Sequence, residues 1–527
     1  MKVFFSIYCT RYEMIIEMTS MLLFWEVFMT TQNTKKLTLT SLVLMIFTSV
    51  YGFANMPRAF YLMGYGAIPW YILGALAFFL PYAFMMAEYG AAFKQEKGGI
   101  YSWMSASIGP KYAFIGTFMW YASYLIWQVN VASSIWIPLS NAFFGEDRTG
   151  SLTFGFLNST QVIGLLGVIL IIIITYVSSK GISWIKQVAS IGGTAIMFLN
   201  LLLILGGFIV LALNGGQFAE PIQTATRKFY QSPNPNYQTL PSIFSFLTYA
   251  IFAYGGIEAV GGLVDQTHHA EKTFPKGVAI AAIVISIGYS VGIFCNGIFI
   301  NWDLILSAPG VNTANVTYII MQNLGYSLAT AFGANPSLAL NIGSLVARLA
   351  GLAMFLALMG AFFTLIYSPL KQIIEGTPPK LWPGKLGVIK NGMPINAMYV
   401  QGIIVSILIL FVSFGGENAS AFFNTLINMT NVAMTIPYMF LAIAFPFFKR
   451  KTHIHKPFEI YKSYGIALIA TIIVTCSVGF ANIFSIIEPA LIKNNVMDTL
   501  FAAIGPIVFS LIAYILYTRY EKKYVSK

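Results

Sequence analysis

Stretches of roughly 20 mostly apolar residues, the length of a transmembrane helix, recur along nearly the whole chain. This pattern limits the possible folds more than any other feature, because a transmembrane barrel would alternate polar and apolar residues over segments of about ten. Composition agrees: 57% of the 527 residues are hydrophobic and only 9% are charged, whereas soluble domains carry about 25% charged residues. The sequence therefore predicts an all-α, polytopic membrane protein and excludes a soluble enzyme.

Hydropathy, with polar connections as boundaries, predicts twelve transmembrane helices. They cover roughly residues 37–63, 68–93, 110–142, 159–178, 184–213, 241–264, 276–301, 339–371, 396–414, 418–447, 462–486 and 499–519. The long connections 214–240 and 302–338 are rich in Asn, Pro, Gly and Ser, and are predicted to be loops on one side. A transmembrane domain at 37–520 would thus lie between segments 1–36 and 521–527.

Basic residues fall mainly on alternate connections, and these include both termini. The opposite connections hold only Arg148, Arg227, Lys228 and Lys493. Because basic connections of membrane proteins stay in the cytoplasm, both termini are predicted to be cytoplasmic, which requires an even number of spans. The net charge of +12 follows from this asymmetry and suits anionic lipid headgroups, so it does not indicate nucleic-acid binding.

The first 36 residues fit neither a signal peptide nor a thirteenth span, since Glu17 and Glu26 interrupt the apolar stretch and no small-residue cleavage site follows. Two interpretations remain. The segment is an amphipathic surface element, or the natural start is Met29 and residues 1–28 precede the natural protein.

Two of the predicted spans combine glycine with polar residues or proline at mid-depth. The first contains Gly52, Asn55 and Pro57, and the sixth contains Gly255 and Gly256. Most transmembrane helices keep every backbone hydrogen bond internal, so such clusters predict interruptions whose free backbone groups line a cavity. Glycine also permits close helix packing, which remains the alternative.

The two interruptions lie at matched depths in spans that are five apart, which is the pattern of two five-helix repeats. Repeat one would cover about 37–213 and repeat two about 241–447, with two extra helices at about 462–519. Because the first span runs outward and the sixth inward, the repeats would be inverted. At the interruptions, amide N–H groups suit a substrate carboxylate and free carbonyls suit a cation.

Three charged residues inside the spans invite interpretation. Glu258 lies near the middle of span six, where a charge is costly, so it is predicted to couple protons or to act as a gate; a structural role beside the loosened backbone is the alternative. Glu88, near the end of span two, is expected to be structural. Arg348, early in span eight, would bind an acidic substrate, pair with a carboxylate in a gate, or reach the outer interface.

Aromatic side chains flank both interruptions, where they would stack on a substrate or enclose it, with bundle packing as the alternative. These residues are Tyr51, Phe53, Tyr249, Phe252 and Tyr254.

Signatures of other chemistry are missing from the sequence. It contains neither a G-x-x-x-x-G-K-[ST] loop nor the common hydrolase motifs. The His and acidic residues at 265–271 lack a standard metal-ligand spacing. We therefore expect no catalytic residues, no cofactor and no metal site.

Four segments together resemble a known family: 87–90 (AEYG), 98–103 (GGIYSW), 252–258 and 271–276 (EKTFPK). Their order and spacing resemble the amino acid–polyamine–organocation (APC) superfamily of transporters, within it the glutamate/GABA antiporter-like branch, and most closely the YjeM group. The resemblance covers about residues 37–520. It implies a LeuT-type fold of two inverted five-helix repeats plus two extra helices.

The resemblance also implies site residues. A nest for the substrate carboxylate would lie at Tyr51-Gly52-Phe53, next to Ser49, although only the glycine keeps the family's pattern. Backbone of Gly255 and Gly256 would face the substrate amino group.

Among side chains, Phe252 would be a gating aromatic, Asn130 a polar residue on the substrate side, and Glu258 the acid associated with proton dependence. Tyr254 would complete the substrate-binding set. Arg348 has no counterpart in the family and would distinguish this substrate.

These features predict a secondary transporter of amino acids or close derivatives in a bacterial-type cytoplasmic (inner) membrane, working by alternating access and by amino acid exchange. Proton-coupled symport is the alternative, and sodium coupling is less favoured because no carboxylate stands beside the first interruption. A nontransporting amino acid sensor with the same fold is a rival of a different class, and a membrane enzyme is a third option. The sequence identifies neither the substrate nor the oligomeric state, but Arg348 and the resemblance to the glutamate/GABA antiporter-like branch favour an acidic or zwitterionic amino acid.

Overall fold

The computed structural model describes residues 36–221 and 231–525. The chain forms two compact units, Met1–Leu37 and Thr38–Lys527, and nearly all of the first lies outside the described residues. The two interpretations of the N-terminal segment, including a start at Met29, fall on that part of the chain.

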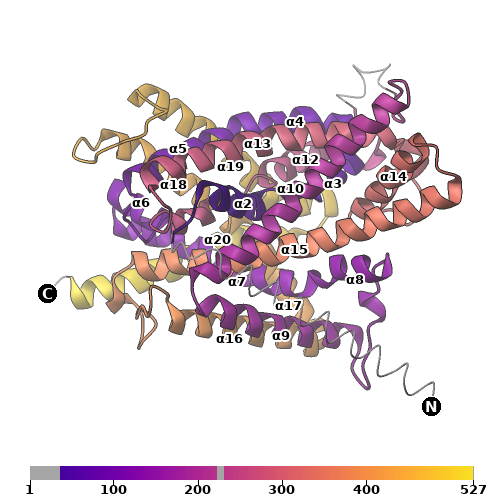
Figure 1. Cartoon of the computed structure of the whole chain (residues 1–527). Coiled ribbons are helices and arrows are strands. Elements are labelled where there is room, and N and C mark those ends of the chain that lie inside the picture. The colour runs from indigo at the N-terminus through magenta and orange to yellow at the C-terminus, as the bar shows by residue number, and fades with distance from the viewer. Residues whose placement is uncertain (1–35, 222–230, 526–527) are drawn as a thin grey trace, which may run out of the picture. The chain divides into compact units, whose positions relative to one another are not determined.

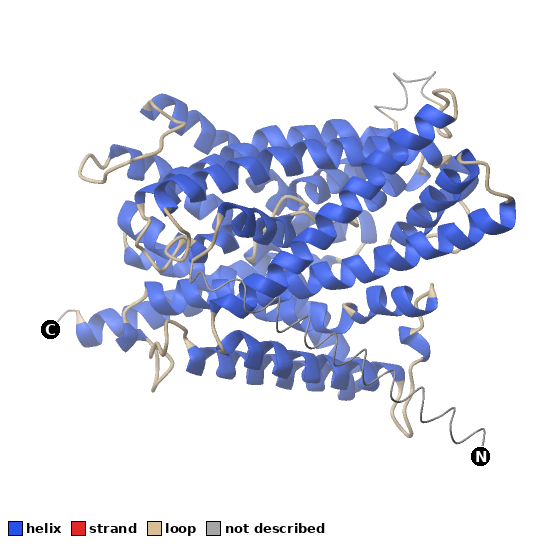
Figure 2. Cartoon of the chain, in the orientation of Figure 1, coloured by secondary structure: helices blue, strands red, loops and turns tan. Residues whose placement is uncertain are grey.

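The second unit is built from helices, and no strand forms in the described residues (Figure 2). In chain order the helices are α2 (Leu39–Val50), α3 (Asn55–Met63), η1 (Gly64–Gly66), α4 (Ala67–Gly74), η2 (Ala75–Phe79), α5 (Leu80–Ala92), α6 (Ile100–Ser107), α7 (Pro110–Ser134), α8 (Trp136–Phe144), η3 (Thr149–Ser151), α9 (Ser159–Ser179), α10 (Ile182–Leu213), η4 (Pro235–Tyr237), α12 (Leu240–Phe252), η5 (Ile257–Leu263), α13 (Ala270–Phe299), η6 (Trp302–Leu306), α14 (Val316–Ala331), α15 (Pro336–Gly376), η7 (Pro379–Leu381), α16 (Ile395–Phe414), α17 (Gly416–Ala433), α18 (Ile436–Arg450), α19 (Tyr464–Lys493) and α20 (Val496–Tyr524).

Ten helical runs in the described residues are long and apolar enough to cross a membrane. The first run, Leu39–Ala92, includes both spans predicted at 37–63 and 68–93, whereas α7, predicted as a span at 110–142, is not among the ten. Each predicted span from 159–178 onward coincides with one run. The fold is therefore an all-α, polytopic membrane protein, while the count of twelve and the inverted relation of the repeats stay predictions.

Both predicted helix interruptions are present. Helix α2 ends at Val50 and α3 begins at Asn55, and α12 ends at Phe252 before the short 3-10 helix η5. Gly256 has a φ of 110°, in the region that favours glycine, and a Cβ there would collide with the carbonyl oxygen of Ser49 on α2. Because residue 256 is glycine, the backbone of the second interruption can contact the end of α2, next to the first interruption.

A third interruption, which the sequence did not predict, divides the span at 418–447. Helix α17 ends at Ala433 and α18 begins at Ile436, with Pro437 in the first turn of α18, where its missing N–H costs nothing.

The connection 302–338, predicted to be a loop, contains the π-helical turn η6 and the sixteen-residue helix α14. The prediction was wrong because α14 is stabilised by packing against the start of α15, where a Cβ on Gly325 would come within 2.9 Å of the Cα of Gly343. Figure 1 shows α14 beside α15, and α9 beside α16. Helix α10 packs against α2, α13 and α15.

Candidate functional site

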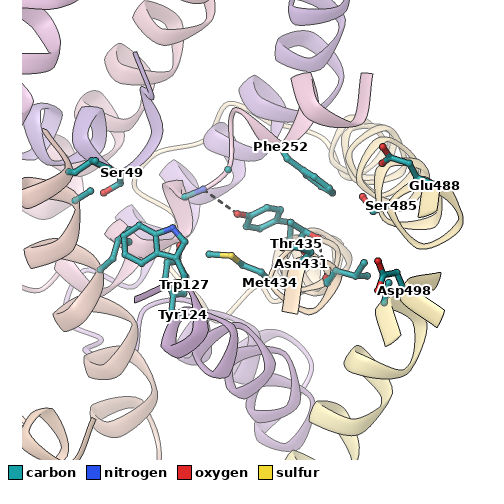
Figure 3. A pocket seen from close by; sticks show the side chains of 18 of the residues that line it. Ser49, Tyr124, Trp127, Phe252, Asn431, Met434, Thr435, Ser485, Glu488 and Asp498 are labelled. Carbon is teal, nitrogen blue, oxygen red and sulfur yellow. Dashed lines mark hydrogen bonds between the residues drawn. The ribbon is translucent and has the colours of Figure 1, made fainter. Parts of the chain in front are cut away.

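A cavity of about 500 Å³ lies where α2 and α12 are interrupted (Figure 3). Its walls come from α2, α7, α12, α15 and α17 to α20, and from the second interruption. The lining residues are Thr48, Ser49, Tyr124, Trp127, Phe252, Gly255, Gly256, Leu358, Ala361, Leu365, Asn431, Val432, Met434, Thr435, Tyr438, Ser485, Glu488, Pro489, Asp498 and Ala502. The cavity is large enough for a small organic molecule.

The sequence predicted four of these lining residues: Ser49, Phe252, Gly255 and Gly256. In Figure 3 the side chain of Phe252 stands between Ser49 at one end of the cavity and Glu488 at the other. The remaining predicted residues lie behind the wall or elsewhere.

Behind the wall, Tyr51, Phe53 and Tyr254 are buried, and Gly52 lies at the first interruption. The Tyr254 hydroxyl donates to the carbonyl of Tyr71 at 3.1 Å. These aromatic side chains therefore support the backbone around the cavity and do not line it.

Two predicted residues are not brought to the cavity. Asn130 is an exposed residue of α7. Arg348 is an exposed residue of α15, and its guanidinium donates to the carbonyl of Phe144 at 3.4 Å, at the C-terminal end of α8. At that position the guanidinium complements the negative C-terminal end of the α8 dipole. Of the three roles predicted for Arg348, this exposed position agrees best with a residue that reaches the outer interface.

Glu258 is fully buried directly behind the cavity. Its Oε1 accepts hydrogen bonds from Trp120 Nε1 at 2.9 Å, Tyr438 OH at 3.1 Å and Tyr124 OH at 3.2 Å. Its Oε2 accepts from the amide of Gly256 at 3.2 Å. Because the indole and amide groups can only donate, the carboxyl group acts here as an acceptor of neutral donors, with no cation paired to it among the described residues.

Tyr124 and Tyr438 line the cavity and also bond Glu258. Tyr438 additionally accepts a hydrogen bond from the Gly256 amide at 3.2 Å. A molecule in the cavity would thus be one hydroxyl away from the buried carboxyl group.

A single hydroxyl joins the two interruptions. Tyr289 OH on α13 accepts from the Gly52 amide at 2.9 Å and from Asn55 Nδ2 at 3.1 Å. The same hydroxyl faces the Val50 carbonyl at 3.0 Å and the Ala253 carbonyl at 3.2 Å as a donor. The backbone of α2 and that of α12 are therefore held to one atom.

Some backbone groups at the interruptions remain available. Among the described residues, the amides of Phe53 and Ala54 donate to no protein group, and the carbonyls of Tyr254 and Gly255 accept no hydrogen bond from the protein. Of these four residues only Gly255 lines the cavity, so its carbonyl is the free acceptor at the cavity wall.

Helix α15 fixes the segment that follows the second interruption. Gln372 donates to the carbonyls of Glu258 and Ala259 at 3.2 and 3.1 Å. Lys371 is buried, donates to the Gly262 carbonyl at 2.8 Å, and pairs with Asp265. The carbonyls that a 3-10 helix such as η5 leaves poorly paired are thus satisfied by side chains.

No three His, Cys, Asp or Glu side chains in the described residues are placed to hold a metal ion together.

Comparison with known proteins shows the family to which this protein belongs. A family model described as amino acid permease matches residues 37–512. The chain belongs to the amino acid permease family. The permease is 52% identical, over 94% of its length and 98% of the relative's, to "Inner membrane transporter YjeM" of Salmonella typhimurium.

More distant relatives carry more specific names. The permease is 25% identical to "Aspartate/glutamate permease AcaP" of Lactococcus lactis, over 83% of this chain and 85% of the relative. It is 23% identical to a "Glutamate/gamma-aminobutyrate antiporter" of the same species, over 86% of this chain and 84% of the relative. The permease is thus a membrane transporter and not an enzyme.

Sequence reasoning missed the roles of Trp127, Thr435, Tyr438 and Tyr289 in the permease. Each lies in or beside an apolar helix where its residue type is also common as packing, so no local signal marked it. Pro437 lies in the first turn of α18, and it was the one local signal that a helix begins there and that Thr435 and Tyr438 lie beside an interruption.

Proposed function

We propose that the permease moves amino acids or close derivatives across the inner membrane by alternating access, and that it exchanges one such substrate for another. The observation that carries this proposal is the cavity at the meeting point of the two interrupted helices, lined by Thr48 and Ser49 of α2 and by Gly255 and Gly256 of the second interruption. The names of the relatives, one of them an antiporter, support exchange.

In this proposal the substrate carboxylate binds near Ser49, next to the first interruption, and the amino group binds near Gly255, with the side chain of Phe252 between them and the Glu488 end of the cavity (Figure 3). Both termini lie in the cytoplasm, as the distribution of basic residues predicts.

Uptake into proteoliposomes tests the proposal. Purified protein would be reconstituted with a radiolabelled amino acid outside and each candidate unlabelled amino acid inside. Exchange predicts uptake that requires internal substrate. Uptake of equal rate and extent into empty vesicles would contradict exchange, and no flux for any amino acid, with binding still detected, would favour a sensor.

Proton-coupled symport is the second candidate, because Glu258 is a buried carboxyl group bonded only to neutral donors. It predicts uptake into empty vesicles that rises with an inward proton gradient. Under this mechanism Glu258→Gln would remove the pH dependence of uptake while the protein stays folded, whereas unchanged pH dependence would exclude a proton role for this residue.

Sodium coupling gains no support from the geometry. The carbonyls of Val50 and Ala253, which could ligate a cation between the interruptions, already face the hydroxyl of Tyr289.

A further inference from the structure

The charged residues that line the cavity are all acidic. Glu488 near the end of α19 and Asp498 near the start of α20 both line it, whereas no Lys, Arg or His does so among the described residues. In Figure 3 the two carboxylates lie at the same end, on the far side of Phe252 from Ser49.

The protein does not neutralise these two carboxylates. Glu488 Oε1 accepts from Ser245 Oγ at 2.7 Å, and Asp498 Oδ2 accepts from Asn495 Nδ2 at 2.9 Å. Neither forms an ion pair within the described part of the chain. Both side chains are half-buried, so their charge is only partly screened by water.

The opposite end of the cavity is polar but uncharged. Ser49 and Tyr124 supply hydroxyl groups there (Figure 3), and the buried carboxyl group of Glu258 lies behind Tyr124. Within the described residues, a substrate in the cavity therefore meets the two carboxylates of Glu488 and Asp498 and no cation, while the carboxyl group of Glu258 lies behind the wall.

We propose that the substrate carries a second ammonium group, as in a basic amino acid or a diamine, and that acidic amino acids are excluded. This inference rests on the proposed transport function. An ammonium group at the Glu488 end would be stabilised by both carboxylates and by the face of Phe252. A side-chain carboxylate would lose its hydration with no positive partner to replace it.

The names of the glutamate-related proteins do not decide this point, because identities of 25% and 23% leave room for a different substrate. The lining of the cavity is a property of this chain itself, and it argues against a dicarboxylate.

Competition in proteoliposomes tests the substrate class. The full-length protein would be assayed with radiolabelled L-lysine, and with unlabelled L-lysine, putrescine, L-glutamate and L-glutamine as competitors. We expect lysine and putrescine to compete at least about tenfold more strongly than glutamate, as expected when opposite charges attract and like charges repel. Transport of glutamate that lysine and putrescine do not inhibit would overturn the inference.

A result without flux is also informative. If no amino acid is transported, the proposed function fails, and thermal stabilisation of the purified protein by each compound still reports the class that binds. Stabilisation by lysine or putrescine alone would then support the cationic class, and stabilisation by glutamate alone would overturn it.

Variants assign the selectivity to the two carboxylates. Glu488→Gln combined with Asp498→Asn should raise the KM for lysine about tenfold and leave the KM for glutamine within about twofold, because only the charged side chain loses its partners. Asp303→Asn, which changes an exposed carboxylate outside the cavity lining, is the matched control and should change neither value. An equal rise in KM for both substrates would assign the carboxylates a structural role and overturn their part in selectivity.

Discussion

At the scale of single residues, Tyr289 shows what a sequence can and cannot reveal. Gly52 and Gly255 predicted the interruptions because glycine clusters at mid-depth mark places where backbone groups are freed from the helix. Tyr289 is one of 29 tyrosines and lies 237 residues from the Gly52 amide that it binds. No local pattern reports a contact over that separation, so the residue that holds both interruptions could not be predicted.

Tyr289→Phe should destabilise the protein by about 1–3 kcal/mol, because the Gly52 amide and two carbonyls lose their buried partner. The transport rate of this variant should also fall. Tyr51→Phe is the matched control: its ring packs against Tyr289 at 4.9 Å, but its buried hydroxyl has no hydrogen-bond partner. Thermal unfolding of the purified variants checks this, and equal midpoints for the two variants would contradict the role of the Tyr289 hydroxyl.

At the scale of elements, Glu88 of α5 holds the connection 451–463 in place through hydrogen bonds. The buried carboxylate pairs with Lys449 at 2.9 Å and accepts the amides of Ile460 and Tyr461, both at 2.6 Å. Burial raises the pKa of Tyr461, so its hydroxyl stays protonated and donates to the Pro81 carbonyl at 2.9 Å. The structural role predicted for Glu88 fits this geometry.

Glu88→Ala should cost about 3–5 kcal/mol, as removal of one partner from a buried ion pair does, and should release the connection. Limited trypsin digestion after Lys451 measures the release as faster cleavage. Glu459→Ala removes the exposed partner of the same Lys449 and should cost about 0–1 kcal/mol. Cleavage at the same rate in both variants would show that Glu88 does not hold the connection.

The helices also show which features of the fold hydropathy does not predict. Most helices from α9 onward fall on their predicted spans, because long apolar runs in a membrane have few alternatives to a helix. Helix α14 and the gap between Ala433 and Ile436 were missed, since the first depends on packing against α15 and the second on a short backbone change inside an apolar run.

For the whole molecule, the distribution of basic residues predicts that both termini are cytoplasmic. A green fluorescent protein fused after Lys527 should fluoresce, and alkaline phosphatase fused there should be inactive. Alkaline phosphatase fused within 302–338 should be active, because this connection is predicted to face outward. An active phosphatase at the C-terminus alone would invert the topology, and activity at both sites would show that an even number of spans, and not the predicted five, separates them.

Tyr289 has one further consequence for the molecule. Its hydroxyl carries a single proton, yet two carbonyl oxygens, those of Val50 and Ala253, stand within reach as acceptors. At any instant the proton serves only one of them, so the junction has two bonding patterns that differ by a rotation about one C–O bond. A movement of α2 relative to α12 would therefore favour one of these two bonding patterns over the other.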